Sequence, residues 1–95
     1  MYARITPFKM KPGSKDDAVK IMNRVKADIM ALPGLKHFIN VMDDNGEGYV
    51  VSLTELSETP PDAQEKIKQI WSNFSHHLEA VPAAATYDVV ADWKK

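Results

Sequence analysis

The sequence predicts an α+β domain in which four strands and two helices follow one another in the order β-α-β-β-α-β. Apolar residues recur at helical spacing in two segments, and four short segments rich in β-branched and aromatic residues surround them. Proline, glycine and asparagine fall between these segments, where turns are expected. This order is typical of the ferredoxin-like fold, a four-stranded antiparallel sheet with two helices on one face.

The first strand is expected over Tyr2–Met10, with Pro7 at an edge position or a bulge. Ser14 is predicted to begin a helix as part of a capping box, its hydroxyl accepting a hydrogen bond from the free amide near Asp17. The Leu32-Pro-Gly34 run is expected to end this helix. Its inward face is predicted to consist of apolar residues spaced three and four apart: Ala18, Ile21, Met22, Val25, Ile29 and Leu32.

The second half of the chain is expected to hold a hairpin, a helix and a last strand. Leu35–Met42 and Gly48–Leu56 are the predicted hairpin strands, and Asn45-Gly46 between them is a strong hairpin signal. The prolines and the aspartate of the Thr59-Pro-Pro-Asp62 run favour a helix start, and that helix is expected to reach about Val81. The last strand is expected over Thr86–Trp93.

Both faces of the predicted sheet carry apolar residues. In a sheet with one face in water, apolar and polar residues alternate along each strand. In the second strand, Leu35, Ile39 and Val41 are expected on one face, and Phe38 and Met42 on the other. Because the helices can cover only one face, we expect a second copy of the chain to cover the other. The sequence therefore predicts a homodimer through the sheet face.

Composition limits the classes of function. The 95 residues are expected to form one domain, residues 1–95. The net charge is −1, with acidic and basic residues interspersed, which argues against nucleic-acid binding. The chain has no cysteine, so disulfides, thiolate metal sites and thiol catalysis are excluded. It also lacks a signal-peptide pattern and a membrane-length apolar run, so we expect a cytoplasmic protein without a membrane partner.

Three motifs resemble the antibiotic biosynthesis monooxygenase domain: Phe8-Lys-Met-Lys-Pro-Gly13, Leu32-Pro-Gly-Leu35 and Trp71-Ser-Asn-Phe74. The resemblance in layout covers Tyr2–Trp93. It implies a dimeric α+β barrel with two sheets packed face to face, and a pocket between the helices and the sheet of each subunit. Such domains include cofactor-free oxygenases of anthrone- and quinol-type substrates, haem-degrading oxygenases and proteins without an established activity.

The sequence departs from that family at several positions. Asn73 replaces the histidine of the family's motif in the second helix, and the strand segment Leu53-Thr-Glu-Leu56 lacks the family's tryptophan. The positions that hold an asparagine, a tryptophan and a histidine in haem-degrading relatives correspond to Thr6, Lys68 and Leu78. Haem degradation by that triad is therefore not expected, and the prediction is that the protein uses no cofactor.

No metal site is predicted. His76 and His77 are adjacent and diverge on a helix. Asp43, Asn45 and Glu47 resemble part of a calcium loop but lack its distal glutamate, so a solvated hairpin turn is the better interpretation.

The second predicted helix contains several candidate site residues. Trp71 and Phe74 fall on its apolar stripe, so Trp71 is expected to be a core residue that can also form one wall of a pocket. His77 falls at the boundary between core and water, on the same side as Asn73. Imidazole exchanges protons near neutral pH, so His77 is a candidate general base, the alternative being a surface or interface residue. His76 is expected to be exposed.

The strands supply the remaining candidates. His37 shares its predicted face with Ile39, so it is expected to be partly buried. It is either a second candidate base or a hydrogen-bonded histidine in the sheet or dimer interface. Tyr49 could donate a hydrogen bond to a bound carbonyl or enolate. Arg4 and Thr6 share a strand face and could bind substrate oxygens if that face looks into the pocket.

The favoured function is a cofactor-independent monooxygenase acting on a small aromatic, quinol or anthrone-type substrate. The protein would deprotonate the substrate and stabilise the carbanion or enolate, which reacts directly with oxygen. His77 or His37 would be the base, and the other candidates would bind the ring and its oxygens. The alternative is a non-catalytic dimeric barrel that binds a small apolar ligand or serves as an accessory or stress protein. A cavity on the order of several hundred cubic ångströms with convergent polar groups favours the enzyme, and a cavity filled by Trp71 and Phe74 favours the alternative.

Overall fold

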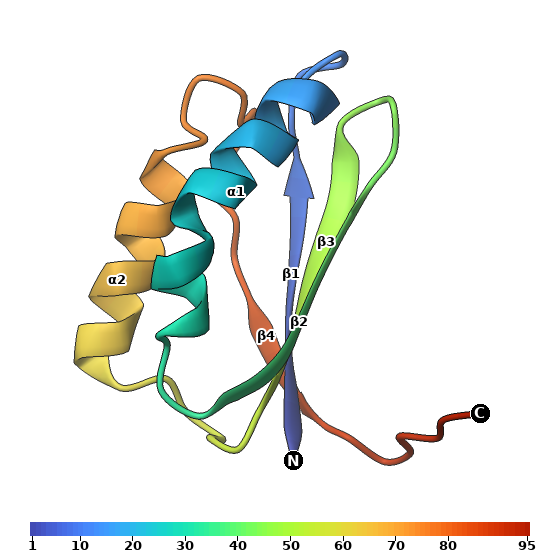
Figure 1. Cartoon of the computed structure of the whole chain (residues 1–95), viewed down its shortest axis with the longest axis vertical. Helices are drawn as coiled ribbons and strands as arrows, with labels where there is room; N and C mark the ends of the chain where they lie inside the picture. The colour runs from blue at the N-terminus through green and yellow to red at the C-terminus, as the bar shows by residue number, and fades with distance from the viewer.

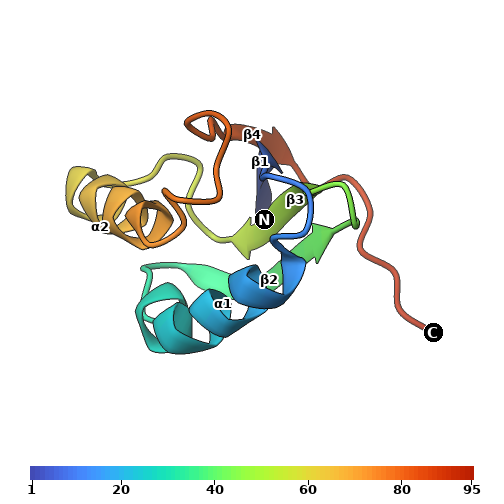
Figure 2. The ribbon, with the colours of Figure 1, turned by 90° about the horizontal axis from the view of Figure 1, so that it is seen from above.

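The computed structural model describes all 95 residues and has the predicted order of elements (Figure 1). The strands form one antiparallel sheet in the order β2-β3-β1-β4. Figure 2 shows both helices on the same side of this sheet, which confirms the ferredoxin-like α+β fold. None of the helices is long and apolar enough to cross a membrane. The elements are β1 (Tyr2–Lys9), α1 (Lys15–Met30), β2 (Leu35–Met42), β3 (Glu47–Thr54), α2 (Pro61–Ser72) and β4 (Ala85–Asp88).

Strand β1 lies inside the sheet, yet it tolerates a proline. It pairs with β3 over its whole length and with β4 only from Tyr2 to Ile5. Pro7 therefore lies beyond the end of β4, at a local edge, where a missing backbone N–H interrupts no second ladder. This is one of the two positions that the sequence predicts for Pro7.

The core lies between the helices and the sheet. The buried face of α1 consists of Ala18, Ile21, Val25 and Ile29, so four of its six predicted inward residues are buried. They pack against side chains from β1 and the residue after it, from β3 and from the turn after α2. Each fully buried large aliphatic or aromatic residue contributes roughly 1.5–3 kcal/mol. These partners are Phe8, Met10, Val50 and Phe74.

A bulge at the start of β2 changes one predicted face. The register between β2 and β3 shifts between Leu35 and His37. Because a shift of one residue moves a side chain to the other face, Leu35 packs against the core instead of lying with Ile39. The prediction that these two residues share a face is wrong.

Helix α2 ends at Ser72, so the prediction that it reaches about Val81 is wrong. The side-chain amide of Asn73 donates to the carbonyl oxygens of Gln69 and Ile70, and such bonds compete with helix continuation. The chain then pairs with the end of β1. The Lys11 amide donates to the His77 carbonyl over 2.8 Å, and the Glu79 amide to the Lys9 carbonyl over 2.9 Å.

Strand β4 is also shorter than predicted, because it ends at Asp88 instead of Trp93. Asp88 pairs with Tyr2 in antiparallel register, and the Val89 amide donates to the Met1 carbonyl over 3.1 Å. The pairing between β1 and β4 thus covers only Tyr2–Ile5 and Ala85–Asp88. Figure 1 shows this C-terminal segment leaving the sheet, and Trp93 is 92% exposed.

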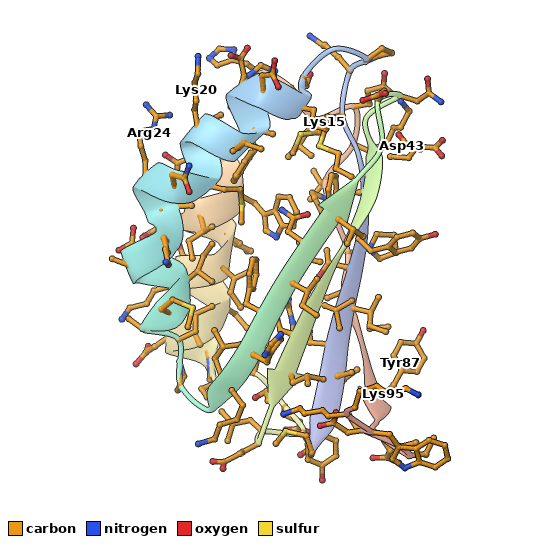
Figure 3. All side chains as sticks on the ribbon, turned by 45° about the vertical axis from the view of Figure 1, so that its right-hand side comes forward. Lys15, Lys20, Arg24, Asp43, Tyr87 and Lys95 are labelled. Carbon is orange, nitrogen blue, oxygen red and sulfur yellow. The ribbon has the colours of Figure 1, made fainter.

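The β2–β3 turn has the predicted hairpin form. Gly46 adopts φ 88°, and one Asp43 carboxylate oxygen accepts bonds from the amides of Asn45 and Glu47 over 2.9 and 3.0 Å. The Asp43 carboxylate therefore stabilises the turn, which confirms the prediction of a hairpin turn in this segment. An exposed ion pair between Lys15 and Asp44 joins the start of α1 to this turn, at the end of the molecule where Figure 3 labels Lys15 and Asp43.

Two glycines of positive φ provide a matched test of the turn geometry. A Cβ added at Gly46 would lie 2.1 Å from the Met10 carbonyl oxygen, whereas one at Gly13, φ 84°, meets nothing within 4 Å. We expect Gly13→Ala to lower the free energy of unfolding by about 1 kcal/mol, the cost of left-handed backbone alone. Gly46→Ala should lower it by about 3 kcal/mol, because it adds a steric clash. Urea denaturation measures both, and equal losses would contradict the hairpin geometry.

Candidate functional site

A cavity of about 80 Å³ lies between the helices and the sheet, where the family resemblance implies a pocket. Thirteen of its 22 lining residues are hydrophobic, so its walls are mainly apolar. Helix α2 and the turn after it provide its aromatic wall, and α1 provides aliphatic side chains. The residues from α2 and the following turn are Ala63, Ile67, Ile70, Trp71 and Phe74.

Two aromatic rings, Trp71 and Phe74, line one wall of the cavity, and Phe8 packs against Trp71 outside the lining. The Trp71 ring centroid lies 5.8 Å from those of Phe8 and Phe74, in tilted arrangements that aromatic pairs favour. Phe74 is buried, and Trp71 is half-buried. Trp71 is thus both a core residue and a cavity wall, the two compatible positions that the sequence predicts for it.

The floor of the cavity is the helix-facing side of the sheet, and it carries the polar groups. Strand register places Ser52 of β3 and Thr86 of β4 on either side of Arg4. Thr6 is the next residue of β1 on the same face, and Asn40 of β2 lies in the same row as Thr6, beyond Val50 of β3. These five side chains line the cavity, as do the polar residues Thr54 and Thr59.

Arg4 is the one ionisable side chain that lines the cavity. The ion pairs of the protein lie elsewhere, between Lys15 and Asp44 and between Lys36 and Glu55. Burial lowers the pKa of the Arg4 guanidinium, which nevertheless stays protonated at neutral pH because arginine titrates far above it. The floor of the cavity therefore holds an unpaired cation.

The Thr6 hydroxyl is a second unsatisfied group at the same floor. Its side chain is only 2% exposed, and Oγ1 has no hydrogen-bond partner. A buried hydroxyl without a partner costs about 1–3 kcal/mol, so such a group needs an explanation, and a ligand is one of them.

A wider groove of about 900 Å³ adjoins the cavity. It runs between α2 and the segment that leads into β4, and its charged side chains besides Arg4 are Glu58, Lys68 and Glu79. The groove and the cavity share wall residues, so Arg4 and Trp71 border both spaces. The shared residues are Arg4, Thr6, Thr59, Ile67, Trp71 and Thr86.

The structure places His37 and Tyr49 on the opposite face of the sheet, away from the cavity. His37 pairs with Leu53, and Tyr49 pairs with Pro7 and Val41. His37 is exposed in the single chain, so the expectation of partial burial is wrong within that chain, and Tyr49 is 53% exposed. Neither side chain lines the cavity.

His77 and Asn73 also lie outside the cavity. His77 Nδ1 is 3.2 Å from the Ser14 hydroxyl oxygen, and this contact replaces the predicted capping box, because Ser14 makes no side-chain bond to its own helix. Asn73 bonds to the carbonyls at the end of α2. His76 is exposed, as predicted.

Of the eight residues that the sequence singles out, the structure brings Arg4, Thr6, Trp71 and Phe74 together at the cavity. Sequence reasoning missed Asn40, Ser52 and Thr86. The signal was present in the strand alternation, because each of them is a polar residue on the same face as Arg4 once the register is known. No three histidine, cysteine, aspartate or glutamate side chains gather in a way that could hold a metal ion.

Comparisons with known proteins identify the fold. No protein-family model and no curated protein matches the sequence, but solved structures match over nearly the whole chain. A candidate antibiotic biosynthesis monooxygenase from Bordetella bronchiseptica aligns with a TM-score of 0.78 at 10% identity, covering 95% of this chain and 97% of that one. Another from Nitrosomonas europaea aligns with a TM-score of 0.74 at 10% identity, covering 94% and 89%.

A variant of MhuD with two manganese protoporphyrin IX molecules bound per active site aligns with a TM-score of 0.66 at 14% identity, covering 100% of both chains. The fold of this protein is therefore that of antibiotic biosynthesis monooxygenase domains, as the sequence motifs predict.

The contact between Ser14 and His77 provides a test of the observed helix start. In a double-mutant cycle of Ser14→Ala and His77→Ala, we expect a coupling energy of about 1 kcal/mol, the usual net contribution of one hydrogen bond. The matched cycle of Ser14→Ala and Asp17→Ala should show no coupling, because the capping box is absent. Urea denaturation of the variants measures both cycles. Coupling of Ser14 to Asp17 instead of His77 would contradict the observed contact and support the predicted capping box.

Proposed function

We propose that this protein is a homodimeric monooxygenase that acts on a small aromatic, quinol or anthrone-type substrate without a cofactor. The observation that carries the proposal is the cavity itself. Trp71 and Phe74 form its aromatic wall, and Arg4 and Thr6 belong to its polar floor. The fold shared with antibiotic biosynthesis monooxygenases supports the same activity. Apolar walls with a few convergent polar groups are typical of small-molecule sites.

In the proposed reaction, the substrate ring packs against Trp71, and its oxygen faces Arg4 and Thr6. Loss of a proton from the substrate leaves an electron-rich anion, which reacts directly with oxygen. For an anthrone, the methylene carbon becomes a carbonyl, so one oxygen atom enters the product and the second leaves as water. The side chains bind the ring and stabilise the anion, and these are the electrostatic and positional effects on which such catalysis depends.

The open face of the sheet supports the proposed dimer. Its side chains form three cross-strand rows that are largely apolar, and no element of the same subunit covers them. Figure 3 shows Tyr87 projecting from this face, opposite the helices. The rows are Val41–Tyr49–Pro7, Ile39–Val51–Ile5–Ala85 and His37–Leu53–Ala3–Tyr87.

A second candidate function, a non-catalytic protein that binds a small apolar ligand, is favoured by the size of the cavity. About 80 Å³ is roughly half of the 150 Å³ that holds one benzene ring in an engineered protein cavity. A quinol or anthrone would therefore extend into the groove or displace Trp71, which borders both spaces.

A haem does not fit the residues present. The positions that resemble those of haem-degrading relatives hold Thr6, Lys68 and Leu78, which line the groove, and no histidine lines the cavity or the groove. The cavity is also far smaller than a porphyrin. The manganese porphyrins of the MhuD variant are a property of that protein.

Sedimentation equilibrium tests the dimer. Ile39 is 45% exposed on the open sheet face, so Ile39→Lys should convert the dimer into monomers by placing a charge in an apolar interface. Val19 on α1 is a matched control, because it is 54% exposed on the helical side, and Val19→Lys should leave the dimer intact. A monomeric wild-type protein, or equal effects of both variants, would contradict the sheet interface.

Oxygen uptake by the chelator-treated protein tests the activity against a panel of quinols and anthrones. We expect uptake above the uncatalysed rate, and Trp71→Ala should lower kcat/KM by about tenfold or more because the ring loses its wall. Val19→Lys, purified in the same way, is the control and should keep the wild-type rate of oxygen uptake. Loss of uptake in His37→Ala or His77→Ala would restore that histidine as the base, and no uptake with any substrate would favour the non-catalytic candidate.

A further inference from the structure

We infer that the cavity binds its ligand as an oxyanion, the ionised form of a phenol, quinol or enol, with the negative oxygen on Arg4 and the Thr6 hydroxyl. The inference rests on the proposed function for the aromatic nature of the ligand. It adds the charge of the bound form and assigns the ionisation of the ligand to Arg4, without a protein base.

The ionisable groups around the cavity favour an anion. The walls contain no carboxylate, imidazole, phenol or amine, so Arg4 provides the one formal charge. A neutral ligand would leave this half-buried cation unpaired. An anionic oxygen would pair with it in surroundings of low dielectric constant, where opposite charges attract more strongly than in water.

The hydroxyl groups of the floor are placed to complete the recognition of an anion. Thr6 is buried, and its oxygen lacks any partner, so donating its proton to the ligand satisfies a group that is otherwise orphaned. Ser52 and Thr86 flank Arg4 on the neighbouring strands and line the same cavity. Several hydroxyl donors and one cation therefore lie on the sheet side of a mainly apolar space.

The other charges near Arg4 lie in the groove. They are Glu58 before α2, Lys68 on α2 and Glu79 in the segment before β4. Arg4 forms no ion pair with either glutamate, since the protein's ion pairs involve other residues. The guanidinium is thus available to a ligand that enters through the groove.

Because the cavity contains no base, Arg4 is the group that favours ionisation of the ligand. When the ligand O–H bond breaks, the electron pair stays on the oxygen beside Arg4, and water in the groove accepts the proton. A cation close to an acid lowers the pKa of that acid by about one to three units. Arg4 would therefore increase the fraction of ligand that is ionised at neutral pH, without any transfer to a histidine.

A redox-inert probe tests this inference. Para-nitrophenol absorbs differently as the phenol and as the phenolate, so spectrophotometric titration gives its pKa in the bound state. We expect the pKa of the bound probe to be about one to three units below that of the free probe. Arg4→Gln should abolish this shift and weaken phenolate binding by about tenfold or more, and Thr6→Val should reduce the shift.

Two controls separate recognition from damage to the fold. Arg24 is exposed on α1, where Figure 3 shows it pointing into solvent, so Arg24→Gln should retain the full shift. Arg4→Lys keeps the charge and should retain part of the shift, provided that circular dichroism shows both Arg4 variants folded. A bound probe that titrates like the free one, an unchanged shift in Arg4→Gln, or no saturable binding above or below the pKa of the free probe would overturn the inference.

The same measurements distinguish this inference from the proposed function. A lowered probe pKa that depends on Arg4, together with no oxygen uptake for any substrate, would support oxyanion binding and reject the monooxygenase. Oxygen uptake without a lowered probe pKa would reject oxyanion binding by Arg4 and support the monooxygenase.

Discussion

The pairing of β1 inside the sheet is the constraint on which the rest of the structure depends. Along this strand, even-numbered residues face the helices and odd-numbered residues face the open side. Arg4 and Thr6 therefore form the floor of the cavity, while Ile5 lies in the open apolar face. The end of the same strand pairs with the chain after α2 and thereby holds Trp71 and its neighbours over that floor. The cavity and the proposed dimer interface thus lie on opposite faces of the same strand.

The fold could be predicted from sequence wherever the signal is local. Gly46 in the hairpin and the apolar spacing of α1 specify their elements from a few neighbouring residues, and both are confirmed. The errors lie where a tertiary interaction overrides a local pattern. The periodicity of α2 continues past Ser72, but the Asn73 amide bonds to the carbonyls at the helix end, and His77 and Glu79 then pair with Lys11 and Lys9 at the end of β1. Beyond Asp88 the strand pattern also continues in the sequence, but the pairing with β1 stops at the Tyr2–Asp88 pair.

The same distinction explains the candidate site. The sequence links Arg4 and Thr6 through strand alternation, and it singles out Trp71 through the apolar stripe of the second helix, which the structure confirms as far as Ser72. The position predicted for His77 depended on a helix that continues past Ser72, and the structure has no helix there. The His77 ring contacts the Ser14 hydroxyl instead. The role expected for Asn73 depended on the same helix. A single sequence does not reveal which face of a two-sided apolar sheet meets the helices, so Tyr49 could not be excluded before the register was known.

The cavity has a chemical consequence that follows from its composition. A site that activates a substrate by proton transfer usually places a base beside the reacting group. Here the space next to the aromatic wall contains one cation and several hydroxyls, and the histidines lie elsewhere. Electrostatic stabilisation of an anion therefore remains the main effect that these residues can provide. Such a site would favour ligands that are already weak acids, because Arg4 would lower the cost of ionisation without removing the proton itself.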